Sequence, residues 1–250
     1  MITRNLTLIA LLFAGTAHAA TFGISFSSSD IDETGSGGLF WNGASGTSPD
    51  FADITATDGT TSTGVSMETT NPGDFISENR GLNAPITENG ITFPGSANQG
   101  YVADNLGSGR DGLMVFRFTA PNASQFEVWD FSIVASYDHN NPSSADHIIH
   151  YNVGGTYNAG TKSFSGGETL TLDAAPVGDN ISAGTLSGIL ASFDGSNYFV
   201  DLQVGYGGSG SQSVGAITAM HVTTAPIPEP STLVLLGIAL GSVMIFRRRK

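Results

Sequence analysis

The chain has 250 residues and a formal net charge of −13 at pH 7, with 22 Asp and Glu residues against nine Lys and Arg residues. It contains no cysteine, which excludes disulfides, thiol catalysis and zinc–thiolate sites. Between residues 20 and 225 four cationic residues stand against 21 acidic ones, a net charge of −17 that repels nucleic acid, so we expect no nucleic-acid partner.

The first recognisable element is an apolar run near the N-terminus. Arg4 precedes ten mostly apolar residues at 6–15 (LTLIALLFAG), and Ala17 and Ala19 then place small residues at the two positions that a signal peptidase reads. A run of this length is too short to span a bilayer, which needs about 20 residues. We therefore predict a secretory signal peptide over residues 1–19, with the Sec export machinery and signal peptidase as partners.

Residues 20–110 form the polar, glycine-rich half of the body that follows. Strands are predicted there only near residues 22–26, 65–69 and 91–93, with long loops between them.

Acidic residues in this half supply the oxygen ligands that calcium prefers. The residues concerned are Asp30, Asp32, Glu33, Asp50, Asp53 and Asp58. Counted from Asp30, the twelfth position is Trp41 where an EF-hand loop needs Glu, so an EF-hand is excluded. Calcium therefore stays the one possible cofactor, without assigned ligands.

The second half of the body alternates apolar and polar residues with period two, as half-buried strands do. In residues 113–119 the residues Met114, Phe116 and Phe118 share one face, and in residues 126–136 Trp129 falls on such a face and is expected in the core. Residues 197–204 place Tyr198, Val200, Leu202 and Val204 on one face, with Asp201 and Gln203 opposite. Further strands are predicted at 147–153, 168–172, 185–193 and 214–222.

Clusters of Gly, Asn, Asp, Ser and Pro separate these segments, so the sequence predicts an all-β domain over residues 20–225, an antiparallel β-sandwich or jelly roll. Several short segments resemble the galactose-binding-like jelly-roll modules common in exported proteins of biofilm-forming bacteria. They are Trp41-Asn42, Thr57-Asp58-Gly59-Thr60, residues 131–136, residues 151–155 and residues 215–222. This resemblance implies carbohydrate or matrix binding by the body.

Aromatic side chains are candidate platforms for sugars, because an aromatic ring packs well on the apolar face of a sugar ring. Tyr137 and Tyr206 border polar loops, and Trp41 lies in the segment that resembles the jelly-roll modules. A zinc site near Asp146, His147 and His150 is disfavoured, since the two histidines would face opposite sides of a strand.

No motif in the body indicates an enzyme. Two G-x-G-x-x-G patterns, starting at Gly107 and Gly205, are followed by strand-like sequence, whereas a dinucleotide site needs a helix there. We expect a non-enzymatic structural, adhesive or carbohydrate-binding body. Two alternatives stay open: a secreted carbohydrate-active hydrolase, and an ice-binding surface protein. Ice binding needs a regular threonine array, and only Thr55-x-Thr57 and Thr169-x-Thr171 approach one.

The C-terminal segment has four features in a fixed order. A Pro-Glu-Pro motif (Pro228, Glu229, Pro230) is followed by Ser231-Thr232, the apolar run of residues 231–246 and a basic cluster. The basic cluster consists of Arg247, Arg248, Arg249 and Lys250. A helix over the apolar run would be about 24 Å long, slightly short of the ~30 Å hydrocarbon core. Its cations are expected to stay in the cytoplasm and stop transfer.

This order resembles the PEP-CTERM sorting signal of Gram-negative bacteria over residues 226–250. The resemblance implies that an exosortase-type membrane enzyme recognises Pro228, Glu229 and Pro230, while a single transmembrane helix holds the chain in the inner membrane. It also implies that the body then reaches the cell surface or an exopolysaccharide matrix. The sequence thus divides into a signal peptide (1–19), a β-sandwich body (20–225) and a sorting tail (226–250).

Overall fold

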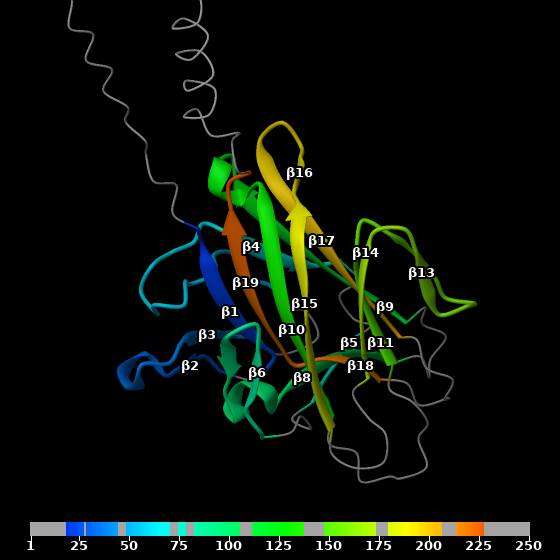
Figure 1. The fold of residues 1–250 in the computed structure, drawn as a ribbon, viewed down its shortest axis with the longest axis horizontal. Helices are drawn as coiled ribbons and strands as arrows, with labels where there is room; N and C mark the ends of the chain where they lie inside the picture. Colours follow the sequence, from blue (N-terminus) through cyan, green and yellow to red (C-terminus); the bar gives the residue numbers. More distant parts are fainter. Residues whose placement is uncertain are drawn as a thin grey trace, which may run out of the picture.

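In the computed structural model the described residues are 19–27, 29–44, 49–70, 75–78, 83–105, 112–137, 148–173, 180–206 and 214–227. These residues form strands and short 3-10 helices, arranged around two stacked sheets (Figure 1). The prediction of an all-β sandwich is therefore confirmed. The predicted signal peptide before Ala19 and the predicted membrane helix at 231–246 lie outside the described residues. Within the described part, no helix is long and apolar enough to cross a bilayer.

The first sheet has six strands and contains both ends of the body. Its order is β15 (Asn180–Leu190), β10 (Val128–Tyr137), β19 (Ala219–Ala225), β1 (Thr21–Ser25), β3 (Phe40–Gly43) and β2 (Ile31–Asp32). Neighbouring strands are antiparallel except for β1 and β3, which run parallel. The antiparallel prediction thus holds for all but one pair of this sheet.

The second sheet is antiparallel throughout. Its order is β14 (Glu168–Asp173), β11 (Ile148–Val153), β17 (Asn197–Tyr206), β9 (Leu113–Pro121) and β4 (Ser66–Thr69), and the short β16 (Ser192–Phe193) also pairs with β17.

Smaller elements surround the two sheets. They are the hairpin β6 (Ile86–Glu88) with β7 (Ile91–Phe93), the hairpin β12 (Thr156–Asn158) with β13 (Ser163–Ser165), the three-stranded sheet of β18 (Val214–Ile217), β8 (Tyr101–Asn105) and β5 (Phe75–Glu78), and the 3-10 helices η1 (Thr34–Ser36), η2 (Gly95–Asn98) and η4 (Ser124–Phe126).

The core between the two sheets is built from aromatic rings on their inner faces. Phe118 of β9 lies 6.2 Å from Phe22 of β1 and 5.6 Å from Phe131 of β10, between ring centroids. Trp129 is fully buried, and its Nε1 donates a hydrogen bond of 2.8 Å to the carbonyl of Phe126. These contacts confirm that the period-two faces of residues 113–119 and 126–136 point inward.

A second, smaller core lies on the outer face of the first sheet. Trp41, Ala219 and Val134 there are buried under Phe93 of the β6–β7 hairpin and Ala97 of η2. The rings of Trp41 and Phe93 are 5.0 Å apart. This outer face is therefore covered by a further layer of chain.

The sequence reading of two regions needs correction. The single strand predicted at 214–222 is two strands in different sheets, β18 and β19. Thr218 between them donates both its hydroxyl and its backbone N–H to the carbonyl of Val134, at 2.8 and 3.0 Å. The half predicted as long loops contains β2, β3, β5, β6 and β8 besides the expected strands.

Candidate functional site

The outer face of the second sheet presents polar and aromatic side chains. On β17, Phe199, Asp201 and Gln203 alternate with the buried Val200, Leu202 and Val204 and therefore point outward. Register places Arg117 of β9 opposite Asp201, and Val115 opposite Gln203. These outward side chains come from two adjacent strands of a rigid sheet.

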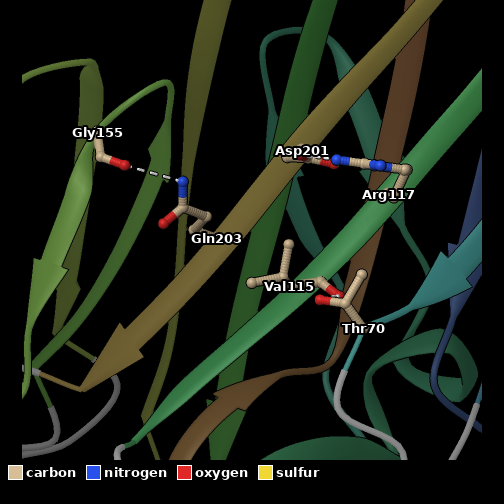
Figure 2. Close-up of polar contacts among 6 residues, drawn as sticks. All are labelled: Thr70, Val115, Arg117, Gly155, Asp201 and Gln203. Atoms are coloured by element: carbon tan, nitrogen blue, oxygen red, sulfur yellow. Dashed lines mark hydrogen bonds and ion pairs between the residues drawn. The ribbon is translucent and has the colours of Figure 1, made fainter.

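An ion pair organises the centre of this face (Figure 2). Arg117 donates from Nε and Nη2 to the two carboxylate oxygens of Asp201, at 2.7 Å each. The guanidinium also lies over the ring of Phe199, with its Cζ 4.9 Å from the ring centroid. Its hydrogen bond to Asp201 raises the pKa of Arg117, which keeps the guanidinium cationic. The pair holds a planar charged group and an aromatic ring side by side.

A notch lies beside this pair, where β17 passes from one partner strand to another. On this side β17 pairs with β16 at Tyr198 and Phe199 and with β11 from Leu202 onward. A hollow of about 250 Å³ occurs between the two partners, and we call it the β17 notch. Its walls include Gly154, Gly155, Leu190, Ser192, Phe199, Asp201 and Gln203.

The glycine wall of the β17 notch is held by a buried amide. Asn152 Oδ1 accepts a hydrogen bond from the backbone N–H of Gly155 at 2.7 Å, and its Nδ2 donates to the carbonyl of Gly166 at 2.9 Å. Gln203 Nε2 donates to the carbonyl of Gly155 at 3.0 Å, as Figure 2 shows. The notch is therefore preformed by internal hydrogen bonds.

The chemistry of the notch suits a small polyhydroxylated ligand. Its volume is slightly below the 300–1,000 Å³ usual for small-molecule sites, which fits one sugar unit of a chain better than a large cofactor. The ring of Phe199 offers an apolar platform, and Asp201, Gln203 and Ser192 offer hydrogen-bond acceptors and donors.

A larger hollow of about 510 Å³ lies beside the start of β1. Its lining includes Ala19, Thr21, Asp58, Thr61 and Gln125 but no aromatic side chain. Hydrogen bonds from Thr61 and Thr60 lower the pKa of Asp58 to about 2 and occupy its carboxylate within the turn. This hollow has more polar side chains than the β17 notch, but it lacks an aromatic ring on which a sugar could pack.

Trp41 does not act as a sugar platform in this structure, which corrects the sequence-based prediction. Its side chain is 0% exposed, packed against Phe93 and over Gly23, because the β6–β7 hairpin covers this side of the first sheet. Tyr137 is the last residue of β10 and Tyr206 is the last residue of β17. The structure does not describe the side chain of either tyrosine.

Four of the acidic residues considered for calcium accept hydrogen bonds from the backbone. Asp30, Asp32, Asp50 and Asp53 each accept a hydrogen bond from a backbone N–H, those of Gly43, Thr34, Thr69 and Gly64 respectively. Among the described residues no three His, Asp or Glu side chains converge on a possible metal position. His150 bonds Thr171 through Nδ1 at 2.9 Å, while Asp146 and His147 lie outside the described part.

The sequence reading did not single out the β17 notch. The alternation of apolar and polar residues at 197–204 already assigns Asp201 and Gln203 to the side opposite the core. This alternation was the one sequence feature that pointed to the notch. The meeting of β11, β16 and β17 depends on long-range pairing that no local pattern reveals.

The predicted sorting residues Pro228, Glu229 and Pro230, the basic cluster 247–250 and Ala17 lie outside the described residues, whereas Ala19 begins the described body. Ile227, just before the Pro-Glu-Pro motif, is the last described residue, and its backbone N–H donates to Glu127 Oε2 at 3.0 Å.

Comparison with known proteins identifies the C-terminal segment. Residues 226–250 match the family model described as the PEP-CTERM protein-sorting motif. This confirms the predicted sorting signal and implies export with membrane-associated processing by an exosortase-type enzyme.

The other comparisons add little about the body. No curated protein matches this chain. A solved structure of TmCBM61 in complex with beta-1,4-galactotriose is similar to it at 8% identity, covering 64% of this chain and 84% of that one, with a TM-score of 0.26. A likeness of this degree carries no argument about the ligand of this chain.

Proposed function

We propose that this chain, which carries a PEP-CTERM sorting motif at residues 226–250, delivers a non-enzymatic polysaccharide-binding β-sandwich to the cell surface or an exopolysaccharide matrix. Residues 1–19 are removed as a signal peptide. Pro228, Glu229 and Pro230 are the recognition residues of the processing enzyme. The apolar run at 231–246 holds the inner-membrane intermediate, and the basic cluster keeps its end in the cytoplasm.

The observation that supports carbohydrate binding most strongly is the β17 notch with its ion pair. A sugar packs its C–H face on Phe199 while its hydroxyls bond to Asp201 and Gln203. The site is open to solvent and fixed by the hydrogen bond between Gln203 and Gly155, so little ordering is needed on binding. The acidic body repels nucleic acid and leaves neutral glycans as suitable ligands.

Binding without turnover is proposed because the notch lacks the usual pair of acids. Glycoside hydrolysis needs two carboxyl groups about 5–9.5 Å apart. Among the described lining residues Asp201 is the single carboxylate, and Arg117 occupies both of its oxygens. No release of reducing sugar is expected from a panel of extracellular glycans. Turnover of any of them would establish the hydrolase alternative.

Ice binding receives less support from the geometry. Thr169 and Thr171 lie on β14, where their hydroxyls bond Asn152 and His150. They do not form a free array. We expect no thermal hysteresis.

The sorting half of the proposal is tested by the mass of the protein in each cell fraction. The mature body is expected outside the cell, starting near Ala20 and lacking the apolar run at 231–246. Replacing Pro228, Glu229 and Pro230 by alanine should trap an unprocessed form in the membrane. Release of this variant at the normal rate would contradict the assigned recognition residues.

The binding half is tested by isothermal titration against a panel of soluble polysaccharides. Phe199→Ala and Asp201→Ala should each weaken binding to the recognised glycan at least tenfold, which corresponds to about 1.4 kcal/mol. Thr92→Ala, an exposed change on the covering β7 strand, is the matched control and should bind normally. Equal affinity of all three variants would remove the β17 notch as the site.

A further inference from the structure

Both ends of the sandwich body leave it side by side. β1 and β19 are antiparallel, with Thr21 opposite Thr223. The backbone N–H of Ala20 donates to Thr224 Oγ1 at 3.2 Å, and the N–H of Thr224 donates to the carbonyl of Ala20 at 2.9 Å. The described chain therefore begins and ends at the same end of the sandwich, where β1 starts and β19 finishes (Figure 1).

A chain of contacts runs across this end from the tail to the β16 corner. Glu127 accepts the backbone N–H of Ile227 at 3.0 Å and the hydroxyl of Tyr198 at 3.2 Å. The ring of Tyr198 packs on that of Phe193, with centroids 5.0 Å apart. Val128 pairs with both Leu190 and Ala225, which places Leu190 at the same end.

The exposed large apolar side chains of the described residues all lie at this end. They are Leu190, Phe193 and Ile227, which are 67%, 48% and 49% exposed, and we call them the end patch. Elsewhere the large apolar side chains of the described part are buried or half-buried. An exposed apolar group confined to one end indicates a contact surface.

The short link between the body and the apolar run indicates which surface the end patch contacts. Four peptide units join Ile227 to Ser231, the first residue of the apolar run, and they span at most about 14 Å when fully extended. While residues 231–246 lie in a bilayer, Ile227 cannot move farther than this from the bilayer surface, and the rest of the end patch lies at the same end of the body. We propose that the end patch is a membrane-docking face that rests on the lipid headgroup region of the bilayer holding the tail.

The charges at this end show what kind of contact it makes. Asp194 accepts the backbone N–H groups of Ser196 and Asn197 at 2.8 and 2.7 Å, and Glu127 is occupied as described above. No Lys or Arg of the described part lies in the patch, so anionic lipid has nothing to attract it. The docking is apolar and does not require anionic lipid.

Docking holds the Pro-Glu-Pro motif next to the membrane surface, where a membrane-embedded enzyme works. Glu127 holds the backbone of Ile227, and the Pro-Glu-Pro motif begins at the next residue. This inference uses the sorting motif but does not depend on the body's ligand, and its failure would leave the glycan proposal untouched.

The absence of cysteine allows a direct test on the full chain. Phe193→Cys places a fluorophore in the end patch. Ser29→Cys places the same fluorophore on an exposed residue beyond the other end of β1. Each labelled chain is inserted by its tail into vesicles of phosphatidylcholine that contain a fraction of lipid with a nitroxide on the headgroup. Circular dichroism confirms that both variants are folded.

The fluorophore at position 193 is expected to lose most of its emission to the headgroup nitroxide, while the one at position 29 keeps its emission. Raising the salt concentration should leave both values unchanged. Equal quenching at the two positions, or none at position 193, would overturn the docking face, because the body would then tumble freely on its tether. Quenching that disappears in high salt would also contradict it, since the contact would be electrostatic.

Discussion

The two sheets of the sandwich have outer faces of opposite character. The outer face of the first sheet is covered by the β6–β7 hairpin and η2, which bury Trp41 and the side chain of His221. The outer face of the second sheet leaves Phe199, Asp201 and Gln203 beside an open notch. Similar residue types thus have different roles: under the hairpin they stabilise the fold, and beside the notch they line a solvent-accessible hollow, where Arg117 and Gly155 hold Asp201 and Gln203 in place.

The largest expected effect comes from opening the covered face. Trp41→Ala removes a fully buried indole from between Phe93 and Gly23, so it should lower the free energy of unfolding by about 3–5 kcal/mol. Phe199→Ala on the open face is the matched change and should cost about 1 kcal/mol or less. Urea denaturation measures both, and equal losses would mean that the two faces do not differ as described.

The buried histidine of the covered face predicts a dependence on pH. Burial lowers the pKa of His221 to about 4, below its ordinary value of 6.5. The unfolded chain therefore binds one more proton between these values, and the stability contributed by the neutral ring is complete above pH 6.5 and is lost as the pH falls toward 4. The loss is on the order of 3 kcal/mol.

Thermal unfolding of His221→Leu at a series of pH values measures this contribution. The slope between pH 4 and 6.5 should be shallower than in the unchanged chain. Part of it should remain, because burial also lowers the pKa of His150. An unchanged slope would show that His221 is not buried in its neutral form.

A smaller loss is expected where the covered face is tightest. A Cβ added at Gly23 would lie 2.6 Å from the Trp41 ring, so Gly23→Ala should cost about 1–3 kcal/mol through overpacking. Gly35→Ala is the control, since nothing lies within 4 Å of its Cβ position. Chemical denaturation should give a clearly lower free energy of unfolding for Gly23→Ala than for Gly35→Ala. Equal stability of the two variants would indicate that the indole of Trp41 moves aside easily.

The smallest effect on stability is expected from the ion pair of the open face. Arg117 and Asp201 are 44% and 28% exposed in their side chains, so solvent screens their attraction. A double-mutant cycle with Arg117→Gln and Asp201→Asn should give a coupling of about 0.2–1 kcal/mol in unfolding. A coupling well above this range would assign the pair to the fold and not to recognition.

Local alternation was enough to predict the parts of the fold with one face in the core. Phe116 and Phe118 of β9, and Trp129 of β10, follow the period-two pattern. One face of each strand packs in the core and requires apolar side chains, whereas the other face tolerates polar ones. β3 escaped notice because its four residues FWNG carry no such alternation, and its parallel pairing with β1 is long-range.

The dependence on long-range contacts also explains why Trp41 was wrongly expected to bind sugar and why the β17 notch was not predicted. Trp41 looked available because nothing within its own segment covers it. The covering residue Phe93 lies about fifty positions later in the chain. The β17 notch likewise requires three strands to meet. The sorting motif at 226–250 was predicted correctly from sequence, because its recognition depends on residue order and not on tertiary contacts.

The most direct test of the difference between the faces is hydrogen exchange followed by mass spectrometry, with and without the glycan that binds most tightly. Binding should slow exchange in residues 153–155 and 197–206 and leave the β6–β7 hairpin unchanged. Protection confined to the hairpin, or to the hollow beside Ala19, would contradict the account and move the ligand site away from the open face.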